Sequence, residues 1–233
     1  GNVTATDSNT LAISGSISSG GNIALTADAG ALTIGGNVTA TAAAKTITLK
    51  STTDILHTAG TVSSQGGAIT YWSDTDTATA AGGGVQIGTS AAVNSNGGAI
   101  TISGGAATST GVAIGTTATT FHGVYMQGSV AAAGGNILIR GQDSSSPTTD
   151  ASTYAAGVQV SRTASITTTG SGTLTILGRT IATDNTKWHD GVILGVLGDS
   201  GTTTISTQTG AISITGDTAS SDYSNRIALG FYY

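Results

Sequence analysis

The chain has 233 residues and a formal net charge of −5, with 36 Gly, no Cys and no Glu. Only 7 residues are Lys or Arg and they are scattered, so no basic stripe is present to neutralise the phosphates of a nucleic acid. No apolar run reaches the roughly 18 residues that cross a bilayer as a helix, so we expect no membrane span in this segment.

Three short apolar motifs recur in the same order along the chain, with polar residues between them. The first, Gly-Val-x-Ile-Gly in its fullest form, centres on Leu11, Leu32, Ile55, Val85, Val124, Val158, Val192 and Ile227. The second is a lone aliphatic residue, at Ile17, Val38, Val62, Val93, Val130, Ile166 and Ile205. The third, Gly-Gly-Ala-Ile-Thr-Ile-Gly, centres on Ile23, Ile47, Ile69, Ile100, Ile137, Leu174 and Ile212.

The third motif usually has a second aliphatic residue two positions on, which places both side chains on one face of a strand. Thr, Val and Ile favour pleated surfaces, whereas good helix formers are scarce. Stacked coils with one strand per side make parallel sheets with inward apolar ladders. We therefore predict an all-β fold, a right-handed parallel β-helix of about seven three-strand coils, forming one domain over residues 1–233.

Glycine runs stand just before several of the expected strands, and asparagine often follows them. The runs are Gly20-Gly21-Asn22, Gly35-Gly36-Asn37, Gly97-Gly98 and Gly134-Gly135-Asn136. Because Gly and Asn tolerate positive φ, we expect sharp corners there. A phosphate-binding loop would need a helix after the glycines, and here a strand is expected instead.

From Trp72 onward the coils lengthen at one corner, between the third motif of one coil and the first motif of the next. The inserts are residues 73–83, 103–122, 142–156, 178–190 and 215–225. Inserts at the same point of successive coils stack, so we expect them to form one ridge. The candidate ligand-binding residues of this ridge and its edge are Trp72, Asp74, Asp76, His122, Tyr154, Trp188, His189 and Asp190, and Tyr71 and Asp143 also lie there.

Two interpretations of this ridge stay open. Its aromatic rings and carboxylates are suited to binding a glycan or a protein, because repeat proteins often bind ligands through inserts on one face. Alternatively, the aromatic residues cover the flank of the apolar core and the aspartates cap turns, which is the commoner use of such residues.

No cofactor is expected, and calcium is the one metal left open. Asp74 and Asp76 have the two-residue spacing of a calcium loop, but the Gly and the terminal Glu of such a loop are missing. His57, His122 and His189 fall in different coils without zinc-ligand spacing, so we expect them to be loop or surface residues.

The main alternative function is a polysaccharide lyase or glycoside hydrolase, since such enzymes occur on β-helices. The nearest cluster for that chemistry is residues 187–190, beside Asp150 and Tyr154, but nothing sets carboxylates across a cleft. We assign no catalytic residue. Threonine pairs such as Thr46 and Thr48 do not keep their place in successive coils, which disfavours an ice-binding array.

The runs Gly97–Gly104 and Gly134–Gly141, with short N-terminal coils, resemble the central shafts of filamentous-haemagglutinin-like exoproteins. These are large bacterial adhesins exported by two-partner secretion or as autotransporters, and the resemblance in repeat style covers nearly the whole chain. It implies a non-catalytic rod segment of a secreted or cell-surface adhesin or extracellular filament, acting in cell adhesion or biofilms. Its implied partners are a host glycan, the matrix or a neighbouring cell surface.

The two ends of the chain carry the same kind of pattern as its middle. Residues Gly1–Thr6 are similar to Gly36–Thr41, and Arg226–Gly230 reads as the start of a coil. No amphipathic helix that would cap a solenoid is evident at either end. We therefore expect both ends to continue into more solenoid, within the same chain or by end-to-end association with another subunit.

Overall fold

The computed structural model describes residues 1–77, 82–115, 121–144, 155–181, 189–195, 200–218 and 226–231. Within these ranges the protein is all-β, without a helix, and its strands lie parallel in two sheets. No helix there is thus long and apolar enough to cross a membrane. The arrangement is consistent with the predicted β-helix or solenoid type of fold.

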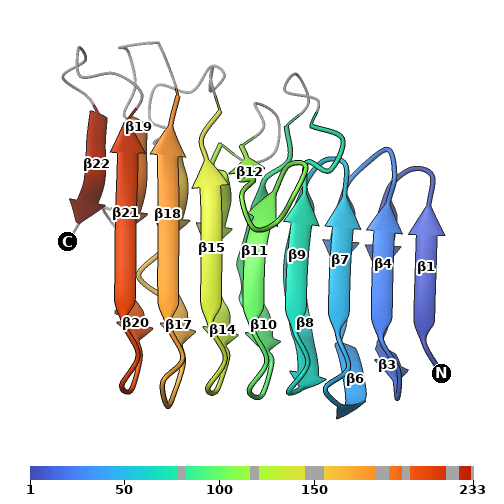
Figure 1. Ribbon diagram of the computed structural model, residues 1–233. Helices are drawn as coiled ribbons and strands as arrows, with labels where there is room; N and C mark the ends of the chain where they lie inside the picture. The colour runs from blue at the N-terminus through green and yellow to red at the C-terminus, as the bar shows by residue number, and fades with distance from the viewer. Residues whose placement is uncertain are drawn as a thin grey trace.

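The first sheet, here called sheet A, contains the third-motif strands side by side (Figure 1). In spatial order they are β1 (Val3–Asp7), β4 (Ile23–Ala27), β7 (Ile47–Ser51), β9 (Ile69–Ser73), β11 (Ile100–Gly104), β15 (Ile137–Gln142), β18 (Leu174–Thr180) and β21 (Ile212–Thr218), with the short β12 (Ala113–Ile114) beside β15.

The second sheet, sheet B, contains two rows of strands. The first-motif row is β2 (Leu11–Ile13), β5 (Leu32–Ile34), β8 (Ile55–Gln65), β10 (Val85–Asn94), β13 (Val124–Met126), β16 (Ala155–Val160), β19 (His189–Leu194) and β22 (Arg226–Phe231). The second-motif row is β3 (Ile17–Ser19), β6 (Val38–Ala43), the C-terminal parts of β8 and β10, β14 (Ser129–Ala131), β17 (Ser165–Thr167) and β20 (Thr204–Ser206). One passage through the three rows is called a coil below.

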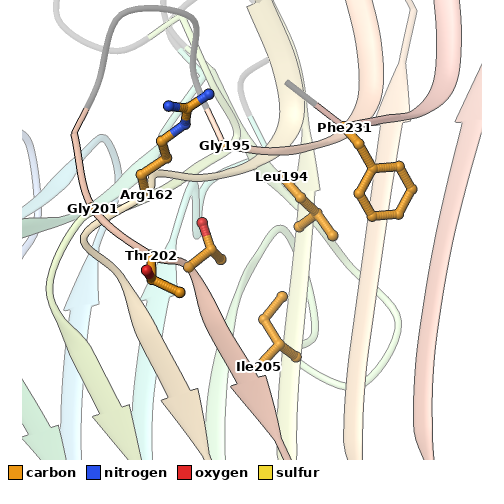
Figure 2. A pocket seen from close by; sticks show the side chains of 8 residues that line it. Arg162, Leu194, Gly195, Gly201, Thr202, Ile205 and Phe231 are labelled. Atoms are coloured by element: carbon orange, nitrogen blue, oxygen red, sulfur yellow. The ribbon is translucent and has the colours of Figure 1, made fainter. Parts of the chain in front are cut away.

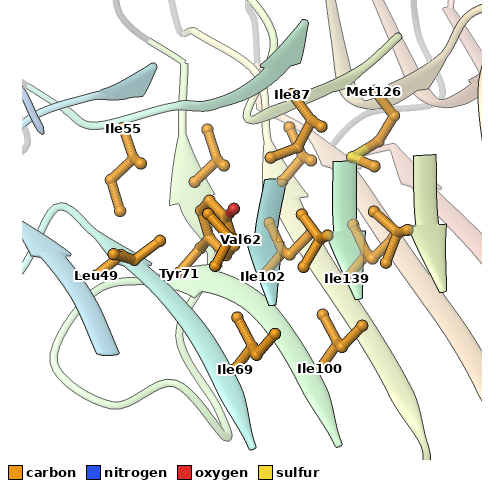
Figure 3. Close-up of a cluster of buried hydrophobic side chains, with 14 of the residues drawn as sticks. Leu49, Ile55, Val62, Ile69, Tyr71, Ile87, Ile100, Ile102, Met126 and Ile139 are labelled. Atoms are coloured by element: carbon orange, nitrogen blue, oxygen red, sulfur yellow. The ribbon is translucent and has the colours of Figure 1, made fainter. Parts of the chain in front are cut away.

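The register of the strands confirms the three predicted apolar ladders through most of the chain. Ile100 pairs with Ile69 and Ile137, and Ile137 pairs with Leu174. Except at the two ends, these side chains are fully or almost fully buried between the sheets, and Figure 3 shows part of this cluster. Alternation of apolar and polar residues therefore sets which side chains form the core.

Two details of the predicted register are wrong, one at each end. Val192 pairs with Leu229, and Ile227 pairs with Asp190 instead. Ile227 and Leu229 have the same parity in their strand, so alternation alone does not say which of them continues the ladder. Val3, whose surroundings are similar to those of Val38, pairs with Ile23 and adds a sheet A strand before the first expected coil.

Positive φ, the conformation expected at these corners, is found in only part of the glycine runs. Gly97 and Gly134 have φ of 113° and 116°, whereas Gly98 and Gly135 have ordinary φ. Gly98 and Gly135 are required because neighbouring coils approach closely there: a methyl group on Gly135 would overlap the carbonyl oxygen of Gly98, and one on Gly98 would overlap that of Gly67. The same contact recurs from coil to coil, and we call its members the glycine column: Gly67, Gly98, Gly135, Gly172 and Gly210.

The asparagines of these runs do not adopt positive φ either. Asn22 Oδ1 accepts a hydrogen bond from Thr46 N at 3.0 Å, and Asn136 Oδ1 accepts one from Thr173 N at 2.9 Å. Asn37 and Thr61 N repeat the arrangement at 2.9 Å. Each asparagine thus holds the next coil through a backbone N–H that would otherwise face the corner unpaired.

A polar pair interrupts the core. His57 takes the place of Ile34 and Ile87 in one ladder, and Tyr71 takes the place of its sheet A neighbours Leu49 and Ile102 in the facing ladder. Both side chains are fully buried, which corrects the expectations of a surface His57 and a Tyr71 on the ridge.

The hydrogen bonds of this pair fix the form of the histidine. His57 Nε2 lies 3.1 Å from Gly60 O, which can only accept, so Nε2 carries the proton. His57 Nδ1 therefore accepts the Tyr71 hydroxyl at 2.9 Å. Burial lowers the pKa of His57 to about 4, partly opposed by its backbone hydrogen bonds, so the ring is neutral at pH 7.

The glycine column makes a test of close packing between coils. Gly98→Ala should cost more than about 1 kcal/mol of unfolding free energy, because its methyl group meets the backbone of Gly67. Gly20→Ala is the matched control, since a methyl group there has open space and φ is ordinary; we expect a change within about 0.5 kcal/mol. Urea melts measure both. Equal effects would contradict the close approach.

The buried histidine predicts loss of stability in mild acid. The unfolded ring binds a proton near pH 6.5 and the folded ring only near pH 4, so stability falls as pH drops between these values. The double variant His57→Ile with Tyr71→Phe restores an apolar ladder and removes this titration. Between pH 7 and 4.5 the wild type should lose about 2 kcal/mol more than the double variant in urea melts. Parallel losses would refute this assignment.

Candidate functional site

All five long inserts begin at the same edge of sheet A. They follow the ends of β9, β11, β15, β18 and β21, whereas β4 and β7 connect to sheet B through short turns (Figure 1). We call this edge the insert edge. The strands therefore bring the described ends of the inserts together, as their positions in the sequence predicted.

The two sheets meet closely at the insert edge through glycines. A methyl group on Gly141 would overlap Gly157 O, and one on Gly178 would overlap Gly191 O. Asp143 follows Gly141 by two residues and Asp190 directly precedes Gly191. The polar side chains of this region therefore lie on the insert side of a backbone contact that closes the apolar core.

Four of the candidate ligand-binding residues are inside the protein. Asp74 and His122 are almost fully buried, and His189 and Asp190 are fully buried. Neither histidine is a surface residue, which corrects that part of the expectation: His122 is a buried loop residue before β13, and His189 is the first residue of β19. Only Trp72 and Asp76 remain at the surface among the described candidates, whereas Tyr154 and Trp188 lie outside the described residues.

Asp143 and His189 form the centre of a buried hydrogen-bond network. Asp143 Oδ2 accepts from His189 Nδ1 at 2.8 Å and from Thr180 Oγ1 at 2.6 Å. Asp143 Oδ1 accepts from Ile181 N at 2.8 Å. Ile181 directly precedes residues 182–188 and His189 directly follows them. One carboxyl group of the preceding coil therefore binds the chain on both sides of this stretch.

His122 has a structural contact of the same kind one coil earlier. Its Nδ1 accepts a hydrogen bond from Ala156 N at 3.1 Å, and its ring packs on Tyr125 with centroids 5.0 Å apart. Burial lowers the pKa of His122 to about 3, so the ring is neutral and suited to accept that N–H. This histidine satisfies the backbone of the next coil instead of facing a ligand.

Trp72 faces outward from sheet A and is already engaged on two sides. The Lys50 ammonium lies 4.9 Å from the centre of its ring, a cation–π contact. Its Nε1 donates to Gly105 O at 2.6 Å, which holds the segment after β11 against the sheet. The ring acts here as a support for that segment.

Asp74 and Asp76 stand at the turn after β9. Burial, and then the Asp76 carboxylate, raise the pKa of Asp74 to about 6, and Asp76 is exposed. Within the described ranges no three His, Cys, Asp or Glu side chains gather to hold a metal ion. Calcium binding by this pair therefore stays a prediction without further ligands assigned.

A hollow of about 460 Å³ lies at the C-terminal end of sheet B, beside β20 (Figure 2). Leu194 and Phe231, which pair across β19 and β22, line it together with Ile205 of β20. Among the described strands β20 pairs only with β17, so the hollow lies beside a strand edge without a second neighbour. We call it the end notch.

Comparison with protein-family models, with curated proteins and with solved structures finds no match.

The network around Asp143 can be tested by removing its carboxyl group. Asp143→Ala leaves Thr180 Oγ1, His189 Nδ1 and Ile181 N without their acceptor in a buried place, so we expect a loss of about 3 kcal/mol or more. Amide exchange at Ile181 should accelerate.

The control is Asp28→Ala, which removes an exposed aspartate from a short turn and should change stability by less than about 0.5 kcal/mol. Urea melts and hydrogen exchange report both variants. If Asp143→Ala costs no more than Asp28→Ala, the carboxyl group does not hold the insert.

Proposed function

We propose that the chain is a non-catalytic rod segment of a secreted or cell-surface bacterial adhesin or extracellular filament. In this proposal its sheets form a right-handed parallel β-helix of about seven three-strand coils, with the inserts at one corner. The observation that carries it is the set of in-register ladders running from β1 to β21 and from β2 to β22, with neighbouring coils joined by hydrogen bonds throughout. Such stacking gives a stiff, elongated body.

The buried polar residues support a structural role over an enzymatic one. Polysaccharide-active enzymes need carboxylates facing a substrate across a cleft. His189 and Asp190, the centre of the predicted alternative cluster, are instead fully buried, and His189 is bonded to Asp143. The contact of His189 with Asp143 serves the attachment of an insert.

The two ends of the ladders support end-to-end stacking. At one end Val3, Leu11 and Ile17 are only half-buried, and at the other Ile212 and Phe231 are 45% and 56% exposed. The end strands of each row lack a second neighbour among the described residues. Apolar side chains beside free backbone groups favour addition of another strand, so a second copy or further coils of the same solenoid fit these edges.

The likeness in repeat style to filamentous-haemagglutinin-like shafts supports an extracellular place. Within this proposal the partners of the rod are a host glycan, the matrix or a neighbouring cell surface. The inserts and the outer face of sheet A are the surfaces available for such contacts. An antibody against the chain should label intact, unpermeabilised cells; labelling only after permeabilisation would contradict this place.

The stacking proposal predicts assembly of the purified chain along one axis. Electron microscopy and light scattering across a concentration series should show rods of constant width whose length grows with concentration. Phe231→Asp places a charge on the apolar end and should shorten them. Ala106→Asp, an exposed change far from either end, should leave their length unchanged. Monomers at every concentration, with slowly exchanging amides in β1 and β21, would overturn the proposal.

A further inference from the structure

The outer face of sheet A carries a raised segment where the chain after β11 folds back over the strands (Figure 1). Trp72 Nε1 holds it at Gly105 O, and Ser103 Oγ donates to Thr108 O at 2.9 Å. Arg140 Nη1 donates to Ser109 O at 2.5 Å. Three side chains of sheet A thus fix residues 105–112 as a wall on a face that the strands alone would leave flat.

A hollow of about 460 Å³ lies between this wall and the strands β15, β18 and β21. We call it the sheet A groove. Its lining includes Thr110 of the wall and the outward-facing Arg140, Leu177, Arg179, Thr215 and Asp217. A volume of this size is within the range of small-ligand sites and accommodates one or two sugar rings.

The strand register arranges the groove side chains in two rows. Arg140 pairs with Leu177, and Leu177 pairs with Thr215, which makes the first row. Arg179 pairs with Asp217 in the second row, and their charged groups are 3.9 Å apart. Arg140 and Arg179 are diagonal neighbours on one face of the sheet, and the Cα atoms of such neighbours are about 7–8 Å apart.

This arrangement concentrates positive charge on an acidic protein. Among the described residues, two of the chain's 7 basic residues line one groove and a single aspartate opposes them, although the chain as a whole has a net charge of −5. Arg140 is fixed at the groove by the bond from its Nη1 to Ser109 O, and the Arg179 side chain is 53% exposed. A guanidinium binds a planar carboxylate through two parallel hydrogen bonds, so a bound carboxylate would use the exposed donors of Arg179 beside the positive charge of Arg140.

We propose that the sheet A groove binds an acidic saccharide through the carboxylate of a uronic acid unit. The carboxylate lies between Arg140 and Arg179. The sugar hydroxyls bond to Thr110, Thr215 and Asp217, and one ring face packs on Leu177. Asp217 would repel a doubly charged phosphate more strongly than a carboxylate, which favours the singly charged group.

Every groove residue comes from one chain and lies on the outer face of sheet A, with Thr215 and Asp217 on its end strand β21, so the site is complete without a stacked partner. The groove is also distinct from the ridge site predicted from the sequence, because its proposed contacts to the carboxylate come from the basic side chains of β15 and β18. Loss of stacking in the end variants would leave binding unchanged, so the two proposals fail separately.

The probe is a trisaccharide of galacturonic acid, compared with the neutral trisaccharide of galactose and with sodium sulfate. Titration into the isotope-labelled chain, followed by nuclear magnetic resonance, should shift the amides of Leu177, Arg179 and Thr215 and the Arg140 Nε–H signal. The neutral sugar should bind at least about tenfold more weakly, because it lacks the charged group. Salt at 0.5 M should weaken binding of the acidic sugar.

Arg179→Gln should weaken binding of the acidic trisaccharide by at least about tenfold, with an unchanged melt because the ion pair to Asp217 is exposed. Arg179→Lys should restore only part of it, since an ammonium lacks the planar fork. Arg162→Gln is the matched control: it removes the same charge beside the end notch and should change affinity by less than twofold.

Three results would overturn the inference. Equal binding of the neutral trisaccharide would show that the carboxylate is not recognised. Equal weakening by Arg162→Gln would show that only overall charge matters. Sulfate that binds as tightly as the trisaccharide and shifts the same amides would show a general anion site without saccharide recognition.

Discussion

The whole structure depends on parallel strands that stack in register, so that each residue lies directly beside its counterpart in the next coil, about 4.8 Å away. A residue therefore meets the same kind of neighbour on both sides. The side chains at one position of successive coils, here called a column, must all be compatible with one another for the coils to pack. Aliphatic columns make the core. The glycine column lets the backbones of successive coils approach at a corner, and Asn22 and Asn136, each directly after a glycine, bond forward to the following coil.

The fold was largely predictable because alternation and recurrence report directly on such columns. The third-motif ladder from Ile23 to Ile212 is as predicted. Errors arose where two residues satisfy the same pattern, as Ile227 and Leu229 do, or where similar short sequences occupy different rows, as around Val3 and Val38. Gly and Asn were placed correctly at corners, and the predicted positive φ holds for Gly97 and Gly134. Gly98 and Gly135 are required instead by close approach between coils, which leaves no mark within a single coil.

The polar residues of the insert edge were much less predictable. Their positions near the inserts followed from the sequence, but their burial did not. Asp143 and His189 are 46 residues apart, and their contact depends on an insert whose length follows no repeat. His57 and Tyr71 replace aliphatic residues in facing ladders. Their burial could have been predicted by aligning the motifs, because each falls at a position where the neighbouring coils carry Ile or Leu. Polar residues at core positions of a repeat are therefore better interpreted as internal partners than as surface groups.

The glycine column also bears on how a chain of this kind changes in evolution. The corner with the glycines has no room for a larger side chain at the column positions, whereas the insert edge accommodates connections of very different length. Any coil presents nearly the same columns above and below, so a whole coil can be duplicated, lost or exchanged at the level of the gene while its neighbours keep their contacts. Length and surface can therefore diverge quickly through the inserts, and the cross-section of the protein stays the same.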